Sequence, residues 1–244
     1  MKILITGASS GLGEELARQY ASPKNELVLL ARREEKLRAL QNALLSVCKD
    51  VKIVVADVTE FQTLQEKIKK IGYVDMVILN AGVSLGHSGN MATIEEFQHL
   101  YDVNVLSNHA ILEVLLPLMQ QRKSGKIVFI SSLASLFSMP TSKVYSSSKR
   151  ALNAYAEAIR HKYKKENIKV VNILPGFIKS ELTDKNDFNM PFLLETSEGV
   201  RRIKKAIDAE KRFYAFPLRF YLIIKALSLL PDALQEFIVE KIRS

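Results

Sequence analysis

Short runs of apolar residues alternate with longer segments of helical periodicity along most of the chain. Such runs are typical of parallel strands covered on both faces, and the periodic segments are typical of helices that pack on such a sheet. The predicted strands span residues 3–5, 26–31, 51–56, 74–79, 125–130, 168–174 and 213–216. The predicted helices span residues 14–20, 34–47, 60–71, 93–121, 142–165 and 197–209. The alternation predicts a doubly wound α/β fold, with a Rossmann-type parallel sheet of about seven strands and helices on both faces.

Three residues bear on the helix boundaries. Thr59 is predicted to cap the helix that ends at Ile71, because a threonine side chain can accept a hydrogen bond from the first helical turn. Asn104 falls in the middle of the helix over 93–121, where an asparagine usually faces solvent. Pro117, near the end of that helix, is predicted to bend the helix or to close it early.

The last part of the chain is strongly apolar. Residues 217–230 are apolar almost all round, and residues 231–244 predict a second helix with one apolar stripe. We therefore expect a domain over 1–216 and a helical extension of that domain over 217–244. The polar interruptions of the first helix are Arg219, Lys225 and Ser228. The stripe of the second helix is Leu234, Phe237, Ile238 and Ile242.

This extension must be covered by the domain, by a second subunit or by a membrane surface. Its apolar run is too short to span a bilayer, which needs about 20 residues. The basic residues Lys211, Arg212, Arg219 and Lys225 would suit a helix lying on an anionic membrane. Packing on the sheet edge or between two subunits would bury the same residues without lipid, and is slightly favoured because it is the more common arrangement.

Composition and charge narrow the class of protein. The 244 residues are enough for one well-cored domain, and 48% hydrophobic with 25% charged residues is ordinary for a globular protein. The net charge of +9 and pI ≈ 9.5 favour a polyanionic ligand: nucleic acid, anionic lipid or a phosphate-rich cofactor. We expect no nucleic-acid partner, because no helix-turn-helix, zinc or aromatic RNA-binding pattern accompanies the charge.

Cysteine usage, the first residues of the chain and the spacing of the histidines add further expectations. Cys48 is the only cysteine, which excludes an intrachain disulfide and a thiolate metal cluster and fits the reducing cytosol. Met1 leads straight into a strand and leaves no room for a signal peptide, so we expect a cytoplasmic protein. No metal site is expected, because metal-ligand spacing is missing among the histidines His87, His99, His109 and His161.

A glycine-rich turn follows the first predicted strand. Gly7, Gly11 and Gly13 lie between that strand and the helix over 14–20. Glycines let a ligand approach the backbone, and the start of a helix offers free N–H groups to phosphate. The spacing differs from the common G-x-G-x-x-G fingerprint, but the position between strand and helix predicts a phosphate-binding turn.

Arg32 and Arg33 follow the second predicted strand. In dinucleotide-binding folds an acidic residue near this point holds the ribose 2′-hydroxyl. Two arginines there favour the 2′-phosphate of NADP instead, because a guanidinium fork matches phosphate geometry. The alternative is a solvated helix start, although cations there oppose the helix dipole. Asp57, after the third strand, is either a turn residue or a cofactor contact.

Tyr145 and Lys149 lie four residues apart, one turn from each other on the same face of a predicted helix. A nearby cation favours the phenolate and pulls the tyrosine pKa from its usual value of about 10 towards the range where acid–base catalysis is efficient. By itself such a pair also arises by chance on helix surfaces.

Taken together, the motifs resemble those of the short-chain dehydrogenase/reductase family in its compact single-domain form. The resemblance runs from Lys2 to about Phe216. Ser180 stands where the family often has threonine, which keeps the hydroxyl. The motifs are Thr6-Gly-x-x-x-Gly-x-Gly13, Asn80-Ala-Gly82, Asn104, Ser132, Tyr145-x-x-x-Lys149 and Pro175-Gly176.

The resemblance implies catalytic roles for four residues. Tyr145 would be the acid in carbonyl reduction or the base in alcohol oxidation, and Lys149 would lower its pKa and bind the nicotinamide ribose. Ser132, rather than the adjacent Ser131, would hold the substrate oxygen. Asn104 would anchor a water molecule that links Lys149 to solvent.

The resemblance also implies an NADP(H) site along the carboxyl edge of the sheet. The pyrophosphate side would be bound by Gly7, Ser9, Ser10, Gly11, Leu12 and Gly13. The adenine and the adjoining ribose with its 2′-phosphate would be bound by Arg32, Arg33, Asp57, Val58, Asn80, Ala81 and Gly82. The nicotinamide end would be bound by Tyr145, Lys149, Pro175, Gly176, Ile178 and Ser180.

A hydrophobic substrate is expected from the segment over 177–194, which occupies the position of the family's substrate loop. Its apolar residues, with Phe137 and Met139 from the loop after the fifth strand, would line a pocket for a hydrophobic carbonyl or alcohol. The alternative is that they cover the helix over 197–209. We expect a homo-oligomeric, dimeric or tetrameric, NADP-dependent carbonyl reductase or alcohol dehydrogenase. A non-catalytic nucleotide sensor or scaffold on the same fold is the second hypothesis.

Overall fold

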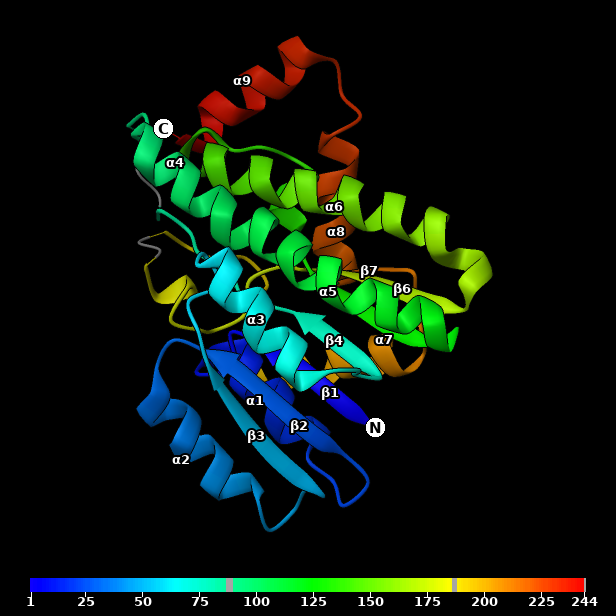
Figure 1. Cartoon of the computed structure of the whole chain (residues 1–244). Helices are drawn as coiled ribbons and strands as arrows, with labels where there is room; N and C mark the ends of the chain where they lie inside the picture. Colours follow the sequence, from blue (N-terminus) through cyan, green and yellow to red (C-terminus); the bar gives the residue numbers. More distant parts are fainter. Residues whose placement is uncertain (87–89, 186–187, 244) are drawn as a thin grey trace.

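The computed structural model describes residues 1–86, 90–185 and 188–243. Within these residues, seven parallel strands form one sheet in the order β3-β2-β1-β4-β5-β6-β7 (Figure 1). The strands are β1 (Lys2–Thr6), β2 (Glu26–Ala31), β3 (Asp50–Val55), β4 (Met76–Leu79), β5 (Gly125–Ile130), β6 (Ile168–Pro175) and β7 (Phe213–Phe216). The predicted parallel α/β sheet is confirmed.

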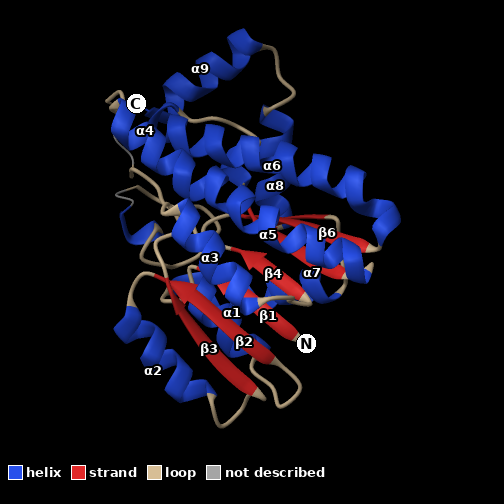
Figure 2. Cartoon of the chain, in the orientation of Figure 1, coloured by secondary structure: helices blue, strands red, loops and turns tan. Residues whose placement is uncertain are grey.

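Helices cover both faces of the sheet (Figure 2). They are α1 (Gly11–Tyr20), α2 (Glu34–Leu44), α3 (Phe61–Ile71), α4 (Ile94–Tyr101), α5 (Ser107–Arg122), α6 (Lys143–Tyr163), α7 (Thr196–Asp208), α8 (Leu218–Leu227) and α9 (Asp232–Arg243). Successive strand residues point to opposite faces. Ile3 and Ile5 of β1 therefore join one core with α1, α2 and α7, whereas Leu4 joins the other core with α3, α5 and α6.

The sequence predicted that Thr59 caps α3, and this prediction is wrong. The helix begins at Phe61, and Glu60 precedes it as the N-cap residue. The backbone N–H and the hydroxyl of Thr59 instead donate to Asp57 Oδ1, at 3.0 Å and 2.8 Å. An aspartate that accepts from the residue two positions on forms a compact turn, and this local bond competes with capping.

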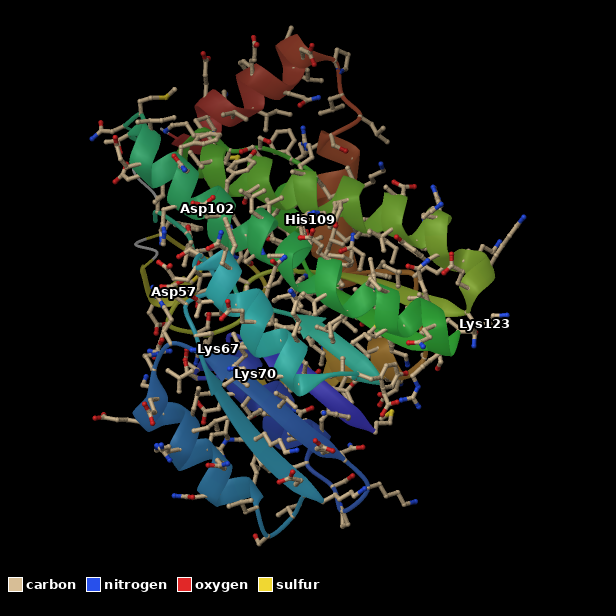
Figure 3. The ribbon with its side chains drawn as sticks, in the orientation of Figure 1. Asp57, Lys67, Lys70, Asp102, His109 and Lys123 are labelled. Carbon is tan, nitrogen blue, oxygen red and sulfur yellow. The ribbon has the colours of Figure 1, made fainter. Side chains whose placement is uncertain are left out.

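The predicted helix over 93–121 is interrupted at Asn104. A π-helical turn, Asp102–Leu106, separates α4 from α5, and Asn104 within it is fully buried rather than facing solvent. Asp102, the first residue of the turn, and His109, in α5, are labelled in Figure 3. Pro117 does not close α5, which continues to Arg122 because Leu115, Leu116 and Met119 remain packed in the core.

Helices α8 and α9 follow the last strand and are coloured orange to red in Figure 1. The ring of Phe220 in α8 packs on the substrate-loop segment, 5.8 Å from the ring of Phe177 and 5.7 Å from that of Phe192. In the described part of the chain, no helix combines the length and the apolar character that a membrane crossing requires. Exposed apolar side chains in and between α8 and α9 are Leu218, Leu222, Ile223, Leu229, Leu234 and Phe237. The side chain of Ile242 lies outside those described.

Candidate active site

The carboxyl ends of the central strands bring the sequence motifs to one edge of the sheet. In the order β3-β2-β1-β4-β5-β6-β7 the chain reverses direction along the sheet between β1 and β4. Ligands of open parallel sheets bind at such a reversal. The glycine turn follows β1, Asn80–Gly82 follow β4, Ser131 and Ser132 follow β5, and Gly176 follows β6.

The glycine turn has a backbone that other residues would not tolerate. Gly7 and Gly11 have φ of +67° and +54°, in the left-handed region that favours glycine. A Cβ on Gly13 would lie 2.1 Å from the carbonyl oxygen of Gly7, so only glycine fits where α1 meets the strand. Ser10 precedes α1 but its side chain does not cap the helix, so its hydroxyl leaves the N–H groups of the first turn to a ligand.

Thr6 and Asn80 tie the glycine turn to the end of β4. The Thr6 hydroxyl accepts hydrogen bonds from the backbone N–H of Asn80 at 2.9 Å and of Ala81 at 3.0 Å. Asn80 Nδ2 donates back to the Thr6 carbonyl at 2.9 Å. These reciprocal bonds fix the two loops against each other, so the Asn80 side chain has a structural role in the site.

Lys149 is a buried cation behind these loops. Its ammonium donates to the carbonyl of Ile130, the last residue of β5, at 2.9 Å. Burial lowers the pKa of Lys149 to about 8, because a charged ammonium loses hydration there. A Cβ on Gly82 would lie 3.4 Å from both Lys149 Nζ and Asn104 Oδ1, which shows that these two groups flank Gly82.

Asn104 is held on all sides by the π-helical turn and its neighbours. Its Oδ1 accepts from the N–H of Val83 at 2.8 Å, and its Nδ2 donates to the carbonyl of Val83 at 3.0 Å and to the hydroxyl of Ser148 at 3.1 Å. Its own carbonyl accepts from Asn108 Nδ2 at 2.7 Å. The irregular turn thus directs an asparagine that a regular helix would have left in solvent towards Gly82 and Lys149.

Tyr145 and Ser132 form the outer part of the site. Tyr145 lies in the first turn of α6, and the Ser132 hydroxyl accepts from the N–H of Ala134 at 3.1 Å. Burial raises the pKa of Tyr145, and a hydrogen bond with the Ser132 side chain acts in the opposite direction. Lys149 Nζ lies 5.7 Å from the centre of the Tyr145 ring. In this state the phenol therefore keeps its proton at neutral pH.

A second group of charges surrounds the start of α2. Arg33 Nε donates to the Ser9 hydroxyl at 3.1 Å, and its guanidinium also contacts the Ser10 hydroxyl and the carboxylate of Glu181. Lys36 reaches the same carboxylate at 2.7 Å. Neither Lys36 nor Glu181 was identified from the sequence. Lys36 could have been, because it lies three residues after Arg33 on one helix, but nothing local marks Glu181.

Arg32 points to a different place from Arg33. Its guanidinium lies 3.4 Å from Asp57 Oδ2, at the carboxyl end of β3, where Figure 3 labels Asp57. Burial acts to raise the pKa of Asp57, but hydrogen bonds from Thr59 and the charge of Arg32 outweigh it, so the pKa is lowered. Asp57 is thus both a turn residue and a charged group on this edge, and the side chain of Val58 is buried.

The loop after β6 lies against the glycine turn. A Cβ on Gly11 would come within 3.2 Å of Ser180 Cβ. Ile178 is buried towards α7 and forms a bridge with Leu194, and its carbonyl accepts a hydrogen bond from the Thr183 hydroxyl at 3.0 Å. The Gly176 N–H donates to the carbonyl of Phe216 at 2.7 Å, which continues the pairing of Pro175 with β7. Leu12 packs on the core at the start of α1.

The aromatic residues of the substrate-loop segment pack on one another and on α8. Phe177 lies 5.6 Å from Phe188 and contacts Phe220, which Phe192 also contacts. The helix that they cover is therefore α8, an arrangement that sequence periodicity had not indicated. In the loop after β5, Phe137 is buried and Met139 is partly buried.

A cavity of about 230 Å³ opens beside Tyr145. It is lined by Leu85, Gly86, Asn90, Met91, Ala92, Glu96 and Thr141–Tyr145. Its lining mixes apolar with polar groups.

Metal-binding clusters of three or more His, Cys, Asp or Glu side chains are not present in the described ranges. His109 Nδ1 is 2.7 Å from the Tyr155 hydroxyl, and His161 lies near Glu157. His99 lies in the last turn of α4. His87 lies outside the described residues.

Known proteins share both the sequence and the fold. A sequence profile of the short chain dehydrogenase family matches residues 1–190. An uncharacterized oxidoreductase of Myxococcus xanthus is 34% identical over 244 aligned residues, which cover 98% of this chain and 96% of the relative. The fold is similar to that of a short-chain dehydrogenase from Sphingobium yanoikuyae in complex with NADPH, with a TM-score of 0.82, 24% identity and coverage of 95% of this chain and 97% of the other. A bulky-bulky ketone specific alcohol dehydrogenase from Comamonas testosteroni matches with a TM-score of 0.81 and 20% identity over 95% of each chain.

Proposed function

Because this chain belongs to the short-chain dehydrogenase family and is an oxidoreductase with an NAD(P)-binding fold, we propose that it transfers hydride between NADP(H) and a hydrophobic carbonyl or alcohol. The observation that carries the proposal is the assembly of Ser132, Tyr145 and Lys149 beside the glycine turn. Two of these groups have pKa values that burial shifts in opposite directions. Such groups in a cleft mark acid–base chemistry.

Tyr145 is the proposed proton donor for carbonyl reduction. Its raised pKa keeps the phenol protonated at pH 7, so a proton is available to the substrate oxygen as negative charge develops there. Ser132, hydrogen-bonded with the phenol, would hold the same oxygen and stabilise that charge. The nicotinamide, when bound, supplies the hydride. In alcohol oxidation the phenolate of Tyr145 would accept the proton.

Lys149 and Asn104 are proposed to restore the proton and to orient the cofactor. Lys149, with a pKa of about 8, can gain or lose a proton near neutral pH. Binding of a dinucleotide would bring ribose hydroxyls to its ammonium, and the charged form would then favour the phenolate of Tyr145. Asn104 flanks Lys149 at Gly82 and is the proposed anchor for the water molecule that connects Lys149 to solvent.

The chain's own geometry fits a phosphate-bearing dinucleotide. The uncapped start of α1 offers N–H groups to the pyrophosphate, and the missing Cβ at Gly13 lets the helix start close to the Gly7 carbonyl. Arg33 and Lys36, with the hydroxyls of Ser9 and Ser10, form a donor set that suits the 2′-phosphate of NADP(H). The remaining proposed contacts are Gly7, Gly11, Leu12, Arg32, Asp57, Val58, Asn80, Ala81, Gly82, Pro175, Gly176, Ile178 and Ser180.

A hydrophobic substrate is supported by the aromatic residues of the loop over 177–194. The rings of Phe177 and Phe192 contact Phe220, and the ring of Phe188 contacts Phe177, so movement of this group would expose apolar surface next to the reacting carbonyl.

We further propose a catalytic unit over 1–216, extended by 217–244, that works as a homo-oligomer in the cytoplasm. The exposed apolar side chains of α8 and α9, such as Leu222 and Phe237, support a second copy as their cover. The single cysteine supports the compartment. Weak contact with an anionic membrane is the competing proposal for this segment. Co-sedimentation with anionic vesicles at low salt would support membrane contact, and a dimer or tetramer that stays in the supernatant would support the second copy.

A panel of carbonyl compounds tests the proposed function directly. NADPH consumption, followed by absorbance, should rise for apolar ketones or aldehydes and stay at background for small polar ones. Binding of NADPH without turnover of any compound in either direction would contradict the enzyme and favour a nucleotide sensor on the same fold.

A further inference from the structure

Glu181 joins the loop after β6 to the basic residues at the start of α2. One of its oxygens lies 2.8 Å from Arg33 Nη1, and the other lies 2.7 Å from Lys36 Nζ. The Arg33 guanidinium also donates to the hydroxyls of Ser9 and Ser10 in the glycine turn. One carboxylate therefore occupies the centre of a donor set drawn from two other segments of the chain.

This donor set is the kind that binds a phosphate monoester. A guanidinium fork, an ammonium and hydroxyl groups converge on one anionic position, and a phosphate could use all of them. A carboxylate fills the same position with a single negative charge, whereas a phosphate monoester carries about −1.5 to −2 at pH 7. Two anions cannot share the position, because their repulsion would add to the loss of donors for each.

We propose that Glu181 is an internal competitor for the 2′-phosphate of NADP(H) and thereby sets how strongly the protein discriminates between NADP(H) and NAD(H). The proposal rests on the proposed function in one respect, namely that the ligand of this edge is an adenine dinucleotide. A 2′-phosphate must displace the carboxylate from Arg33 and Lys36, whereas an unmodified 2′-hydroxyl leaves both ion pairs in place.

Electrostatics keep this competitor charged. The pKa of Glu181 is lowered to about 2, first by the hydrogen bond from Lys36, with burial opposing it and Arg33 and Ser10 lowering it further. The carboxylate is therefore ionised throughout the physiological range. Because it is tethered to the same chain, it competes at a high effective concentration that does not change with dilution.

The same contact couples the cofactor edge to the substrate loop. Glu181 follows Ser180, which lies against Gly11 of the glycine turn. The loop returns at Leu194, whose N–H donates to Phe177 and whose carbonyl accepts from Lys179, both at 3.0 Å. Glu181 therefore ties the start of the substrate loop to the cofactor edge through its ion pairs with Arg33 and Lys36.

The opposite role for Glu181 makes a different prediction. If the carboxylate only held Arg33 in a binding-competent position, its removal would weaken binding of the 2′-phosphate. As a competitor, its removal strengthens that binding. The sign of the change therefore separates the two roles, and neither needs a substrate.

The test compares 2′,5′-ADP with 5′-AMP, two probes that differ only in the 2′-phosphate and lack the nicotinamide. Isothermal titration at low salt would be performed on wild type, Glu181→Gln and Glu181→Ala. Surface ion pairs contribute little each, so we expect about three- to ten-fold tighter binding of 2′,5′-ADP in both variants, with 5′-AMP binding unchanged. The matched control is Glu195→Gln, which removes the same charge from the same loop but pairs with Lys179.

Each outcome decides one question. Tighter 2′,5′-ADP binding in the Glu181 variants, but not in Glu195→Gln, supports the competitor. Unchanged or weaker binding, or an equal change for both probes, overturns it while leaving the cofactor proposal intact if wild type still prefers 2′,5′-ADP. No preference in wild type or in any variant removes the cofactor proposal and the competitor together. Combining Glu181→Gln with Arg33→Ala should abolish most of the gain, and a full gain in that background would also overturn it.

Discussion

Two groups of cations lie at the same edge of the sheet, and they differ in how far they are buried. Lys149 is buried with its ammonium on the Ile130 carbonyl, whereas the side chains of Arg33 and Lys36 are 43% and 49% exposed and meet Glu181. Burial changes the chemistry of the first group, because lost hydration brings the pKa of Lys149 to about 8. Exposure leaves the second group charged and screened, so it can select a ligand but contributes modest energies.

The comparison orders the expected effects of mutation. Substitutions in the buried group should lower turnover by orders of magnitude or change the pH dependence of stability, because each removes a group that holds one proton. Changes in the exposed group should alter affinity for one cofactor by much less, from about two-fold to somewhat more than ten-fold, and leave the chemistry intact. The following predictions test that separation.

The largest effect is expected for Tyr145→Phe. The ring and its packing survive, but the transferable proton does not, so turnover should fall by about a hundred- to ten-thousand-fold. NADPH affinity should stay near that of wild type. The matched control is Tyr155→Phe, on the same helix, whose hydroxyl contacts His109 instead. Near-normal turnover of a confirmed substrate by Tyr145→Phe would show that another group donates the proton.

The pH dependence of stability tests the burial of Lys149. Its folded pKa of about 8 lies below the unfolded value of about 10.4, so between these pH values the unfolded chain holds a proton that the folded protein has lost. Stability of the cofactor-free protein should therefore rise with pH across that window. The expected gain from this group is about 3 kcal/mol, and at pH below 8 its full cost remains.

Chemical denaturation at several pH values measures this difference between wild type and Lys149→Met. The difference in unfolding free energy should grow in favour of wild type from pH 8 to 10. Lys162→Met, an exposed position on the same helix, should follow wild type. Parallel curves for wild type and Lys149→Met would mean that the ammonium is hydrated.

Sequence patterns predicted the buried group better than its setting. Apolar runs located every strand, and the spacing of Tyr145 and Lys149 predicted that both lie on one helix, which is α6. The helical pattern alone indicated that Asn104 faces solvent, and only the family resemblance implied a position near Lys149. The pattern could not show its burial, because the π-helical turn that buries it depends on tertiary bonds to Val83 and Ser148.

The exposed group was only half predictable. The role of Arg33 could be predicted from its position directly after a strand, because dinucleotide-binding folds place a ribose contact there. Glu181 lies 148 residues further along the chain and meets Arg33 only after β6 is in the sheet. In the same way, the packing of Phe220 on Phe177 joins segments that no local periodicity relates.

Within the exposed group, Arg33→Ala should have the larger effect. It removes the guanidinium that faces Ser9 and Ser10, and charge-assisted bonds to phosphate are each worth about 1.5–3 kcal/mol. NADPH binding should weaken about ten-fold or more, and NADH binding much less. Titration of both cofactors measures the ratio. Equal losses for NADPH and NADH would mean that Arg33 does not contact the 2′-phosphate.

The smallest effect is expected for Arg32→Ala, although the sequence alone gives the two arginines the same role. The Arg32 side chain is 61% exposed, and its guanidinium lies 3.4 Å from Asp57, away from the hydroxyls that Arg33 contacts. Its charge can attract the 2′-phosphate only through solvent, where screening acts over about 8 Å. We therefore expect NADPH binding to weaken about two- to five-fold, which is less than for Arg33→Ala.

The control for this small change is Arg38→Ala, which removes the same charge from α2 at a side chain paired with Glu34. A loss for Arg32→Ala that exceeds the Arg38→Ala loss, and that shrinks as salt is added, fits a screened contribution. A loss as large as that of Arg33→Ala would mean that Arg32 leaves Asp57 and binds the phosphate directly. In that case the arrangement of the two arginines changes when the cofactor binds, and exposure in the free protein is a poor guide to their share of the binding energy.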